Sequence, residues 1–409
     1  MPSWCGCSSK RSEIGLPAAA QGWQHGPMHL PPIYPITDPR APLPLAAQIR
    51  ALGDAGFPLV QFRGKPLDAA AQWRELAAAL AGAAARGGWP AICVNDRSDL
   101  AVLAAAQGLA PWGLHLGQGD LPAGVARELP GIKGLHLGCS THRAGEWNEP
   151  DPACDHAGIG PFRATASKAD HAEPIGLEGL RAGCAALRAR GVAPVAIGGL
   201  TMADARDCFE AGAEALAMVA EVARAADPAE LLWRAQGERW RACPPIAPGR
   251  GIVLVGGSGA GKSALAGLLS QLLGLPARDS DTWVEAGAGL AVARIFAACG
   301  EAGFRALEAR AVRACVESPA VVALGAGAWE DPATREAVRA AGFTALWLAE
   351  VPERAWARVG RDPSRPLATS REQFLARWAS RRAAWSEAPM VLPLGRSPKA
   401  LAAALAGGL

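Results

Sequence analysis

The sequence predicts an α/β chain with two consecutive domains: a closed parallel barrel of eight β/α units, then a doubly wound parallel sheet. Two observations predict this division. Short apolar segments alternate with Ala- and Leu-rich helical stretches over about the first 240 residues. A glycine loop, Gly256–Ser263, then follows an apolar run and precedes a helical pattern, which is the context in which a phosphate-binding sheet begins.

Composition bounds the possible partners. The chain has 409 residues, is half hydrophobic and carries a net charge of +3, so it is long enough for two or three domains and too weakly basic to indicate nucleic acid. No apolar stretch reaches the roughly 18 residues expected of a membrane span. Ten scattered cysteines without C-x-x-C favour a reducing compartment over zinc, so we expect a cytoplasmic protein. Nothing in the sequence indicates an oligomeric state.

The expected boundaries follow from local composition. Residues 1–27 lack periodicity and are expected to be a disordered extension; the barrel then occupies residues 28–240. Three prolines and a glycine fall within residues 241–249, which predicts a short, stiff linker between domains that sit close together but fold separately. The second domain takes residues 250–409.

The barrel prediction, a (β/α)8 or TIM barrel, depends on eight apolar segments. They are Ile33–Thr37, Leu59–Arg63, Ala91–Asn95, Gly113–Leu116, Lys133–Gly138, His156–Gly160, Pro194–Ile197 and Ala215–Val219. Helical stretches intervene, among them Leu45–Gly53, Ala69–Arg86, Leu177–Arg190 and Met202–Ala211. Eight such units in about 210 residues favour a closed barrel, whose chemistry lies at the C-terminal ends of the strands.

Those strand ends are polar. Asp96 and Asp120 follow adjacent strands and can share a hard cation such as Mg²⁺. Arg63, Lys65 and Lys168 are cations suited to a diphosphate. Gly198-Gly199, before a helix, can offer backbone N–H groups to a second phosphate. The set indicates displacement of a diphosphate by a phosphorylated nucleophile.

In these strand ends the segment resembles thiamine-phosphate synthase over essentially the whole barrel. The motifs that carry the resemblance, in matching order and spacing, are Gln61–Lys65, Asn95-Asp96, His115–Asp120, Gly138–His142, Gly160–Lys168 and Ile197–Leu200. The resemblance implies Mg²⁺ ligation by Asp96 and Asp120. It also implies, for the aminopyrimidine diphosphate and the thiazole phosphate, substrate contacts from Gln61, Arg63, Lys65, Asn95, Ser140, Thr165, Ser167, Lys168, Gly199, Val219 and Ala220.

The implied reaction is dissociative: diphosphate leaves, and the thiazole nitrogen attacks the pyrimidine-methyl cation. Lys168 is then expected to act in catalysis. Gly64, His156 and Ala220 depart from the family's usual Glu, Tyr and Ser. A thiazole tautomerase relative of the same barrel is the alternative, but it does not need the paired carboxylates. A retired domain that serves as an interaction module is the other alternative.

The glycine loop that opens the second domain matches the P-loop pattern G-x-x-x-x-G-K-[ST]. It predicts ATP binding by Gly256, Gly257, Ser258, Gly259, Ala260, Gly261, Lys262, Ser263 and Ala264. The loop's N–H groups and the following helix N-terminus favour phosphate. Lys262 is expected to reach the outer phosphates, and Ser263 to hold Mg²⁺.

Downstream motifs make the second domain resemble shikimate kinase over its full length of about 160 residues. They are D-x-D-x-x-x-E from Asp279, G-E-x-x-F-R-x-x-E from Gly300, the turn Gly325–Gly327, R-P-L from Arg365 and R-x-x-x-W from Arg381. Arg305 and Arg381 suit a bidentate carboxylate clamp.

In the reaction this resemblance implies, ATP phosphorylates shikimate. Asp281 helps to deprotonate the attacking hydroxyl, Asp279 acts through Mg²⁺ with Ser263, and Arg365 closes on the phosphates as a lid residue. Ala326, Ala264 and Trp385 depart from the usual Gly, hydroxyl residue and Tyr; the position of Ala326 contacts substrate in the family. Another small-molecule carboxylate kinase is the alternative. The sequence thus predicts a bifunctional enzyme acting on small molecules, with Mg²⁺ in both domains and ATP as co-substrate.

Overall fold

The computed structural model describes residues 30–164, 172–243, 250–360, 370–393, 399 and 401–402. The predicted extension at residues 1–27 and most of the predicted linker lie outside these ranges. Within them no single helix is both long and apolar enough to cross a bilayer. Helices α12 (Ser280–Ala288) and α13 (Val292–Cys315) pass such a test only when taken together, and they meet at a bend of 91°.

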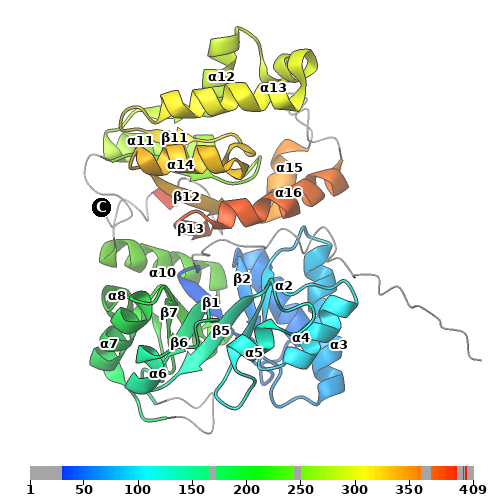
Figure 1. Ribbon diagram of the computed structural model, residues 1–409, viewed down its shortest axis with the longest axis vertical. Helices are drawn as coiled ribbons and strands as arrows, with labels where there is room; N and C mark the ends of the chain where they lie inside the picture. Colours follow the sequence, from blue (N-terminus) through cyan, green and yellow to red (C-terminus); the bar gives the residue numbers. More distant parts are fainter. Residues whose placement is uncertain are drawn as a thin grey trace, which may run out of the picture.

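The first domain is an eight-stranded parallel sheet that closes on itself, as predicted (Figure 1). Its strands are β1 (Ile33–Pro35), β2 (Leu59–Phe62), β3 (Ala91–Asn95), β4 (Gly113–Leu116), β5 (His136–Thr141), β6 (His156–Ile159), β7 (Ala193–Ile197) and β8 (Ala215–Met218). β1 pairs with β8, and a bridge between Ile36 and Gln61 joins it to β2. The barrel is therefore closed between its first and second strands.

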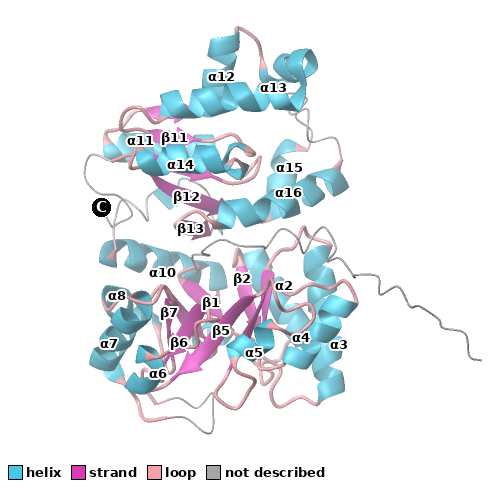
Figure 2. Ribbon diagram, in the orientation of Figure 1, coloured by secondary structure: helices cyan, strands magenta, loops and turns pink. Residues whose placement is uncertain are grey.

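Helices surround this sheet (Figure 2). They are α2 (Leu45–Ala55), α3 (Ala69–Ala84), α4 (Ser98–Ala106), α5 (Ala123–Arg127), α6 (Ala144–Asn148), α7 (Gly176–Arg188), α8 (Ala205–Glu210), α9 (Ala220–Arg224) and α10 (Pro228–Ala242). The Asp68 side chain caps α3 by accepting from the N–H of Ala71 at 2.7 Å. α8 is shorter than the predicted helix over 202–211, because Met202–Asp204 forms a 3₁₀ turn instead.

One strand prediction was wrong in position. β5 starts at His136, three residues after the predicted start, because Gly131–Gly134 form a turn. Gly131 has a φ of 79°, which favours glycine and ends the preceding segment. The strand consequently runs on through Ser140 and Thr141, and it delivers Ser140 to the barrel mouth from a strand rather than a loop.

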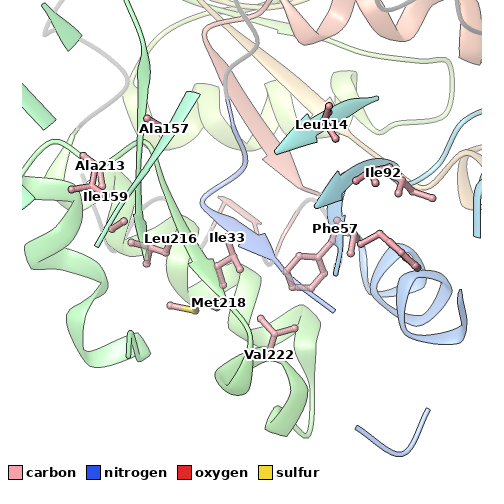
Figure 3. Packing of buried hydrophobic residues seen from close by; sticks show 14 of the residues in the cluster. Ile33, Phe57, Ile92, Leu114, Ala157, Ile159, Ala213, Leu216, Met218 and Val222 are labelled. Carbon is pink, nitrogen blue, oxygen red and sulfur yellow. The ribbon is translucent and has the colours of Figure 1, made fainter. Parts of the chain in front are cut away.

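Alternation along the strands divides the barrel core. Ile33 and Val60 belong to the apolar layer under the helices, whereas the neighbouring Tyr34 and Leu59 belong to a second cluster. Figure 3 shows part of the first layer, with Ile33 and other strand residues packed beside Phe57. Because successive strand residues point to opposite faces, the second cluster fills the barrel interior.

The second domain is a five-stranded parallel sheet in the order β10-β11-β9-β12-β13. Its strands are β9 (Ile252–Val255), β10 (Ala277–Asp279), β11 (Val321–Ala323), β12 (Thr344–Ala349) and β13 (Met390–Pro393). Besides α12 and α13 it has α11 (Lys262–Leu273), α14 (Pro332–Ala340), α15 (Pro352–Val359) and α16 (Arg371–Ser386). The first strand in sequence lies at the centre, as a doubly wound sheet requires. We call this unit the P-loop domain.

The P-loop domain sits on the barrel at the N-terminal ends of the barrel strands (Figure 1). Three barrel tryptophans, Trp89, Trp233 and Trp240, belong to the apolar cluster of the P-loop domain rather than to the barrel's own. An ion pair of 2.9 Å joins Arg86 to Glu353 across the junction. The two domains lie close together, as expected from the short linker, and they share an apolar cluster that the sequence did not indicate.

Candidate active sites

The barrel has a cavity of about 1030 Å³ at the C-terminal ends of its strands. The described site residues predicted for the barrel all line it: Gln61, Arg63, Lys65, Asn95, Asp96, Asp120, Ser140, Gly199, Val219 and Ala220. Thr165, Ser167 and Lys168 lie outside the described residues. Residues from six of the strand ends thus meet in one place, although they span about 160 residues of sequence.

Two carboxylates and one lysine form the charged centre of this barrel cavity. Lys65 Nζ lies 2.5 Å from Asp96 Oδ2, and Asp120 Oδ2 accepts from the N–H of Gly117 at 2.7 Å. Burial opposes ionisation of Asp96, yet Lys65 outweighs it and holds the pKa of Asp96 below its usual value. Burial raises the pKa of Asp120, and the neighbouring charge of Asp96 adds to this effect.

The backbone at Asp96 is also unusual. Its φ is 62°, in the left-handed region that non-glycine residues rarely adopt. Its N–H donates to the carbonyl of His115 at 2.7 Å, which fixes the turn after β3. A strained backbone at a charged residue in a cavity is typical of a functional position.

The donor set fits a hard divalent cation that shares its coordination with a substrate. Among the described residues, no group of three or more His, Cys, Asp or Glu side chains could enclose a metal alone. Two neighbouring carboxylates at the mouth of the cavity match Mg²⁺ sites in which phosphate oxygens and water complete the shell.

A chain of histidines supports Ser140 from below. His115 Nε2 lies 3.1 Å from Ser140 Oγ, and its Nδ1 lies 3.4 Å from Nε2 of His156. A Cβ at Gly138 would come within 2.2 Å of His156 and 2.5 Å of His115, so only glycine leaves room for both rings. Burial lowers the pKa of His156 well below its usual value, and the ring is neutral at neutral pH. Sequence reasoning noted His156 only as a departure from the family's Tyr.

The second cavity, of about 540 Å³, lies over the P-loop. The described site residues that line it are Gly257, Ser258, Gly259, Gly261, Lys262, Ser263, Ala264, Asp279, Asp281, Arg305, Ala326 and Arg381. Gly256 and Ala260 belong to the loop but do not line the cavity. Arg365 lies outside the described residues.

The P-loop has the expected geometry. Gly261, with a φ of 90°, turns the chain into α11, and Lys262 follows as the first helical residue. Lys262 Nζ donates to the carbonyls of Gly256 at 2.8 Å and Gly257 at 2.9 Å. Ser263 Oγ donates to Asp279 Oδ2 at 2.6 Å, which brings a hydroxyl and a carboxylate together as Mg²⁺ ligands require.

The two arginines of the predicted clamp each hold an acidic partner. Arg305 lies 2.5 Å from Glu308 and 3.0 Å from Glu301, and Arg381 lies 2.7 Å from Glu330. Burial lowers the pKa of Arg381, and Glu330 opposes this effect. Burial raises the pKa of Glu308, although Arg305 counters it. Both guanidinium groups are thus fixed in place at the cavity wall before a carboxylate arrives.

The turn after β11 explains why alanine is accepted at its centre. A Cβ at Gly325 would lie 2.3 Å from Glu308 Oε1, and one at Gly327 would lie 2.3 Å from the Arg305 guanidinium. The flanking glycines therefore carry the close approaches, whereas Ala326 lines the cavity and accepts, through its carbonyl, from Trp385 Nε1 at 3.1 Å. Trp385 thus donates a hydrogen bond where the family usually has Tyr.

Sequence reasoning missed several residues of this cavity wall. Arg358, Arg377 and Trp378 line it, whereas Glu308, the last residue of the motif from Gly300, is buried at its edge. Arg358 bonds the carbonyl of Gly259 at 2.8 Å and so touches the P-loop itself. No short motif contains Arg358 or Arg377, and an arginine on a helix face reads as a solvated charge.

Known proteins match the two domains separately. A family model described as thiamine monophosphate synthase matches residues 33–222, and one described as shikimate kinase matches residues 258–402. The thiamine-phosphate synthase of Laribacter hongkongensis is 37% identical over 202 residues, covering 49% of this chain and 90% of that protein. The shikimate kinase of Symbiobacterium thermophilum is 44% identical over 144 residues, covering 31% of this chain and 82% of that protein. A solved shikimate kinase from Acinetobacter baumannii, in complex with shikimate, is 30% identical with a TM-score of 0.36, over 38% of this chain and 88% of that one.

Proposed function

The chain belongs to the thiamine-phosphate synthase family over residues 33–222 and to the shikimate kinase family over residues 258–402, and we propose that each of the two cavities catalyses one of the two reactions. The chain is an enzyme with both activities. One observation carries the assignment of residues: in each domain, the predicted polar site residues that the structure describes converge on a single cavity.

In the barrel, the proposed reaction joins an aminopyrimidine methyl diphosphate to a thiazole phosphate. The bond between the methylene carbon and the diphosphate oxygen breaks, and a bond from that carbon to the thiazole nitrogen forms. Arg63 and Lys65 supply positive charge for the departing diphosphate. Gln61, Asn95 and Ser140 orient the pyrimidine, with Ser140 held by His115.

Asp96 and Asp120 would hold Mg²⁺, which supplies charge neutralisation for the leaving diphosphate. Lys65 then has two partners in succession, Asp96 before the substrate binds and the diphosphate afterwards. Gly198, Gly199, Val219 and Ala220 form the wall at which the thiazole phosphate is expected. The carboxylate pair favours the synthase over the tautomerase alternative.

In the P-loop domain, the proposed reaction transfers the γ-phosphoryl group of ATP to a shikimate hydroxyl. The P-loop and Lys262 hold the phosphates, and Ser263 with Asp279 would hold Mg²⁺, which neutralises the transferring group. Arg305 and Arg381 bind the carboxylate of shikimate. Asp281 accepts the hydroxyl proton as the new oxygen–phosphorus bond forms and the bond to ADP breaks. Arg365 is proposed as a lid residue.

Paired assays on the full chain test this division. Thiamine phosphate should form from the two phosphorylated halves with Mg²⁺, and ADP should be released when shikimate is added with ATP. Asp96→Ala should abolish the first reaction and spare the second, whereas Asp281→Asn should do the reverse. A native chain that performs only one reaction would show that the other domain is a retired enzyme. ADP release with another small carboxylic acid in place of shikimate would support the alternative carboxylate kinase.

A further inference from the structure

Helix α16 connects the kinase cavity with the barrel. Arg381 and Trp385 lie on its cavity side, and Arg381 is one of the two arginines proposed to bind the shikimate carboxylate. The next residue, Arg382, is only 2% exposed and points to the barrel instead. Consecutive helix residues project about 100° apart, so one helix can present the two arginines to different neighbours.

The barrel receives Arg382 with main-chain carbonyls and an aromatic ring. Nη2 donates to the carbonyl of Pro58 at 2.7 Å, and Nη1 donates to the carbonyl of Gly88. The guanidinium carbon lies 5.0 Å from the centre of the Trp89 ring. Charge-assisted bonds and cation–π contacts are strongest when water is excluded, as it is here.

The barrel segment that makes these contacts is itself closely packed. Trp89 is fully buried, and its Nε1 donates to the carbonyl of Gly53 at 2.9 Å. Gly87 approaches α16 so closely that a Cβ there would lie 2.9 Å from the carbonyl oxygen of Leu375. The helix therefore rests on main-chain atoms just before β3 and on the buried Trp89 ring.

On its other side α16 reaches the substrate region at three points. Trp385 Nε1 donates to the carbonyl of Ala326, and Arg381 pairs with Glu330 at 2.7 Å. The Trp378 ring packs on Gly257 of the P-loop, where a Cβ would come within 2.1 Å of the ring. Because the helix is continuous, its contacts with the barrel fix the positions of Trp378, Arg381 and Trp385.

We propose that the barrel is part of the scaffold of the kinase site, and that Arg382 is a positioning residue that fixes α16 so that Arg381 meets the acceptor carboxylate. This inference rests on the proposed kinase function. The P-loop lies between β9 and α11 and meets α16 through the Trp378 ring, whereas Arg381 would contact the acceptor directly, so the effect should fall on the acceptor more than on ATP.

The test uses the full chain with Arg382→Gln, Arg382→Lys and, on the barrel side, Trp89→Phe. Displacing a binding group by about 1 Å can cost up to roughly a hundredfold. We therefore expect the shikimate KM of Arg382→Gln to rise about ten- to a hundredfold, with the ATP KM within about threefold of native. Arg382→Lys should lie between, since it keeps the charge, and Trp89→Phe should raise the shikimate KM in the same direction.

Two controls separate positioning from general damage. Arg371→Gln, an exposed position on the same helix, should leave both KM values unchanged. Synthase turnover, measured on the same samples, should be unchanged in every variant because the barrel mouth lies at the opposite ends of the strands.

The proposal is overturned if the shikimate KM of the Arg382 variants matches that of Arg371→Gln, or if the ATP KM rises as much as the shikimate KM. If Arg382→Gln does not accumulate as folded protein, the same comparison of the shikimate KM with the ATP KM is made for Arg382→Lys and Trp89→Phe. A native chain that releases no ADP with shikimate would instead refute the kinase assignment, which is a different result.

Discussion

A methyl group at Gly325 offers a direct test of the kinase geometry. A Cβ there would lie 2.3 Å from Glu308 Oε1 and 2.8 Å from Asp281 Oδ1. Ordinary contact begins near 3.4 Å, so the two oxygens must retreat by about 1.1 Å and about 0.6 Å. The turn cannot easily move instead, because the N–H of Gly325 donates to the buried Ser280 Oγ at 2.8 Å.

The strain therefore falls on the two carboxylates. Glu308 is 2% exposed and paired with Arg305, so its displacement also shifts one arginine of the clamp. A misplacement of this size at a reacting group costs about a hundredfold in rate. We expect Gly325→Ala to lower kinase kcat about a hundredfold and to destabilise the fold by only about 1–2 kcal/mol, since the clashing atoms are side-chain ends.

The assay is ADP release under saturating ATP and shikimate, combined with thermal unfolding. Gly287→Ala is the matched control: Gly287 lies inside α12, and a Cβ there would meet nothing within 4 Å. That variant should keep native kcat and gain up to about 1 kcal/mol of stability from the better helix former. If Gly325→Ala turns over at the native rate, Asp281 does not sit where the proposed proton transfer needs it.

Three further predictions concern other contacts. Trp385→Phe removes the hydrogen bond to the Ala326 carbonyl, so the shikimate KM should rise roughly fivefold, corresponding to about 1 kcal/mol, with Trp385→Tyr closer to native. Gly138→Ala should lower synthase turnover at least tenfold and leave the kinase rate unchanged, since the methyl group would displace His115 from Ser140. Burial holds the pKa of His156 below 6.5 in the folded state, so the unfolded state binds the extra proton as the pH falls. The free energy of unfolding should therefore drop below pH 6.5, by up to about 1.4 kcal/mol per pH unit. Thermal unfolding between pH 5 and 8 should show a flatter acid limb in His156→Gln; equal slopes would contradict the assignment.

Much of the barrel and its cavity was predictable because the alternation of apolar strands and helical stretches places the family motifs at the predicted strand ends. Polar residues that follow an apolar run indicate where a strand ends, and Asp96 and Asp120 follow two such runs. The offset of β5 was not predictable from periodicity, since Lys133 and Gly134 directly precede the alternating segment Leu135–Leu137 but turn with Gly131. Local conformational preference at one glycine decided the register.

The domain junction was not predictable for a different reason. Trp89, Trp233 and Trp240 are large apolar residues of the barrel segment, and they are buried. Nothing in their spacing says which core they join. Arg382 likewise follows Arg381 in a motif and reads as a surface charge, although its guanidinium is enclosed by main-chain carbonyls. Burial of an arginine is a property of the assembled fold.

The position of the P-loop domain at the N-terminal ends of the barrel strands has a consequence for how substrates and products reach and leave the two sites. Pro58 and Gly88, which contact α16, precede their strands, whereas the synthase cavity opens where the strands end. The synthase mouth therefore faces away from the P-loop domain, and its metabolites exchange with bulk solvent at the far end of the barrel from that domain. Neither product reaches the other cavity without diffusing around the barrel, so each reaction should respond to the concentrations of its own substrates alone, even though both are carried on one polypeptide.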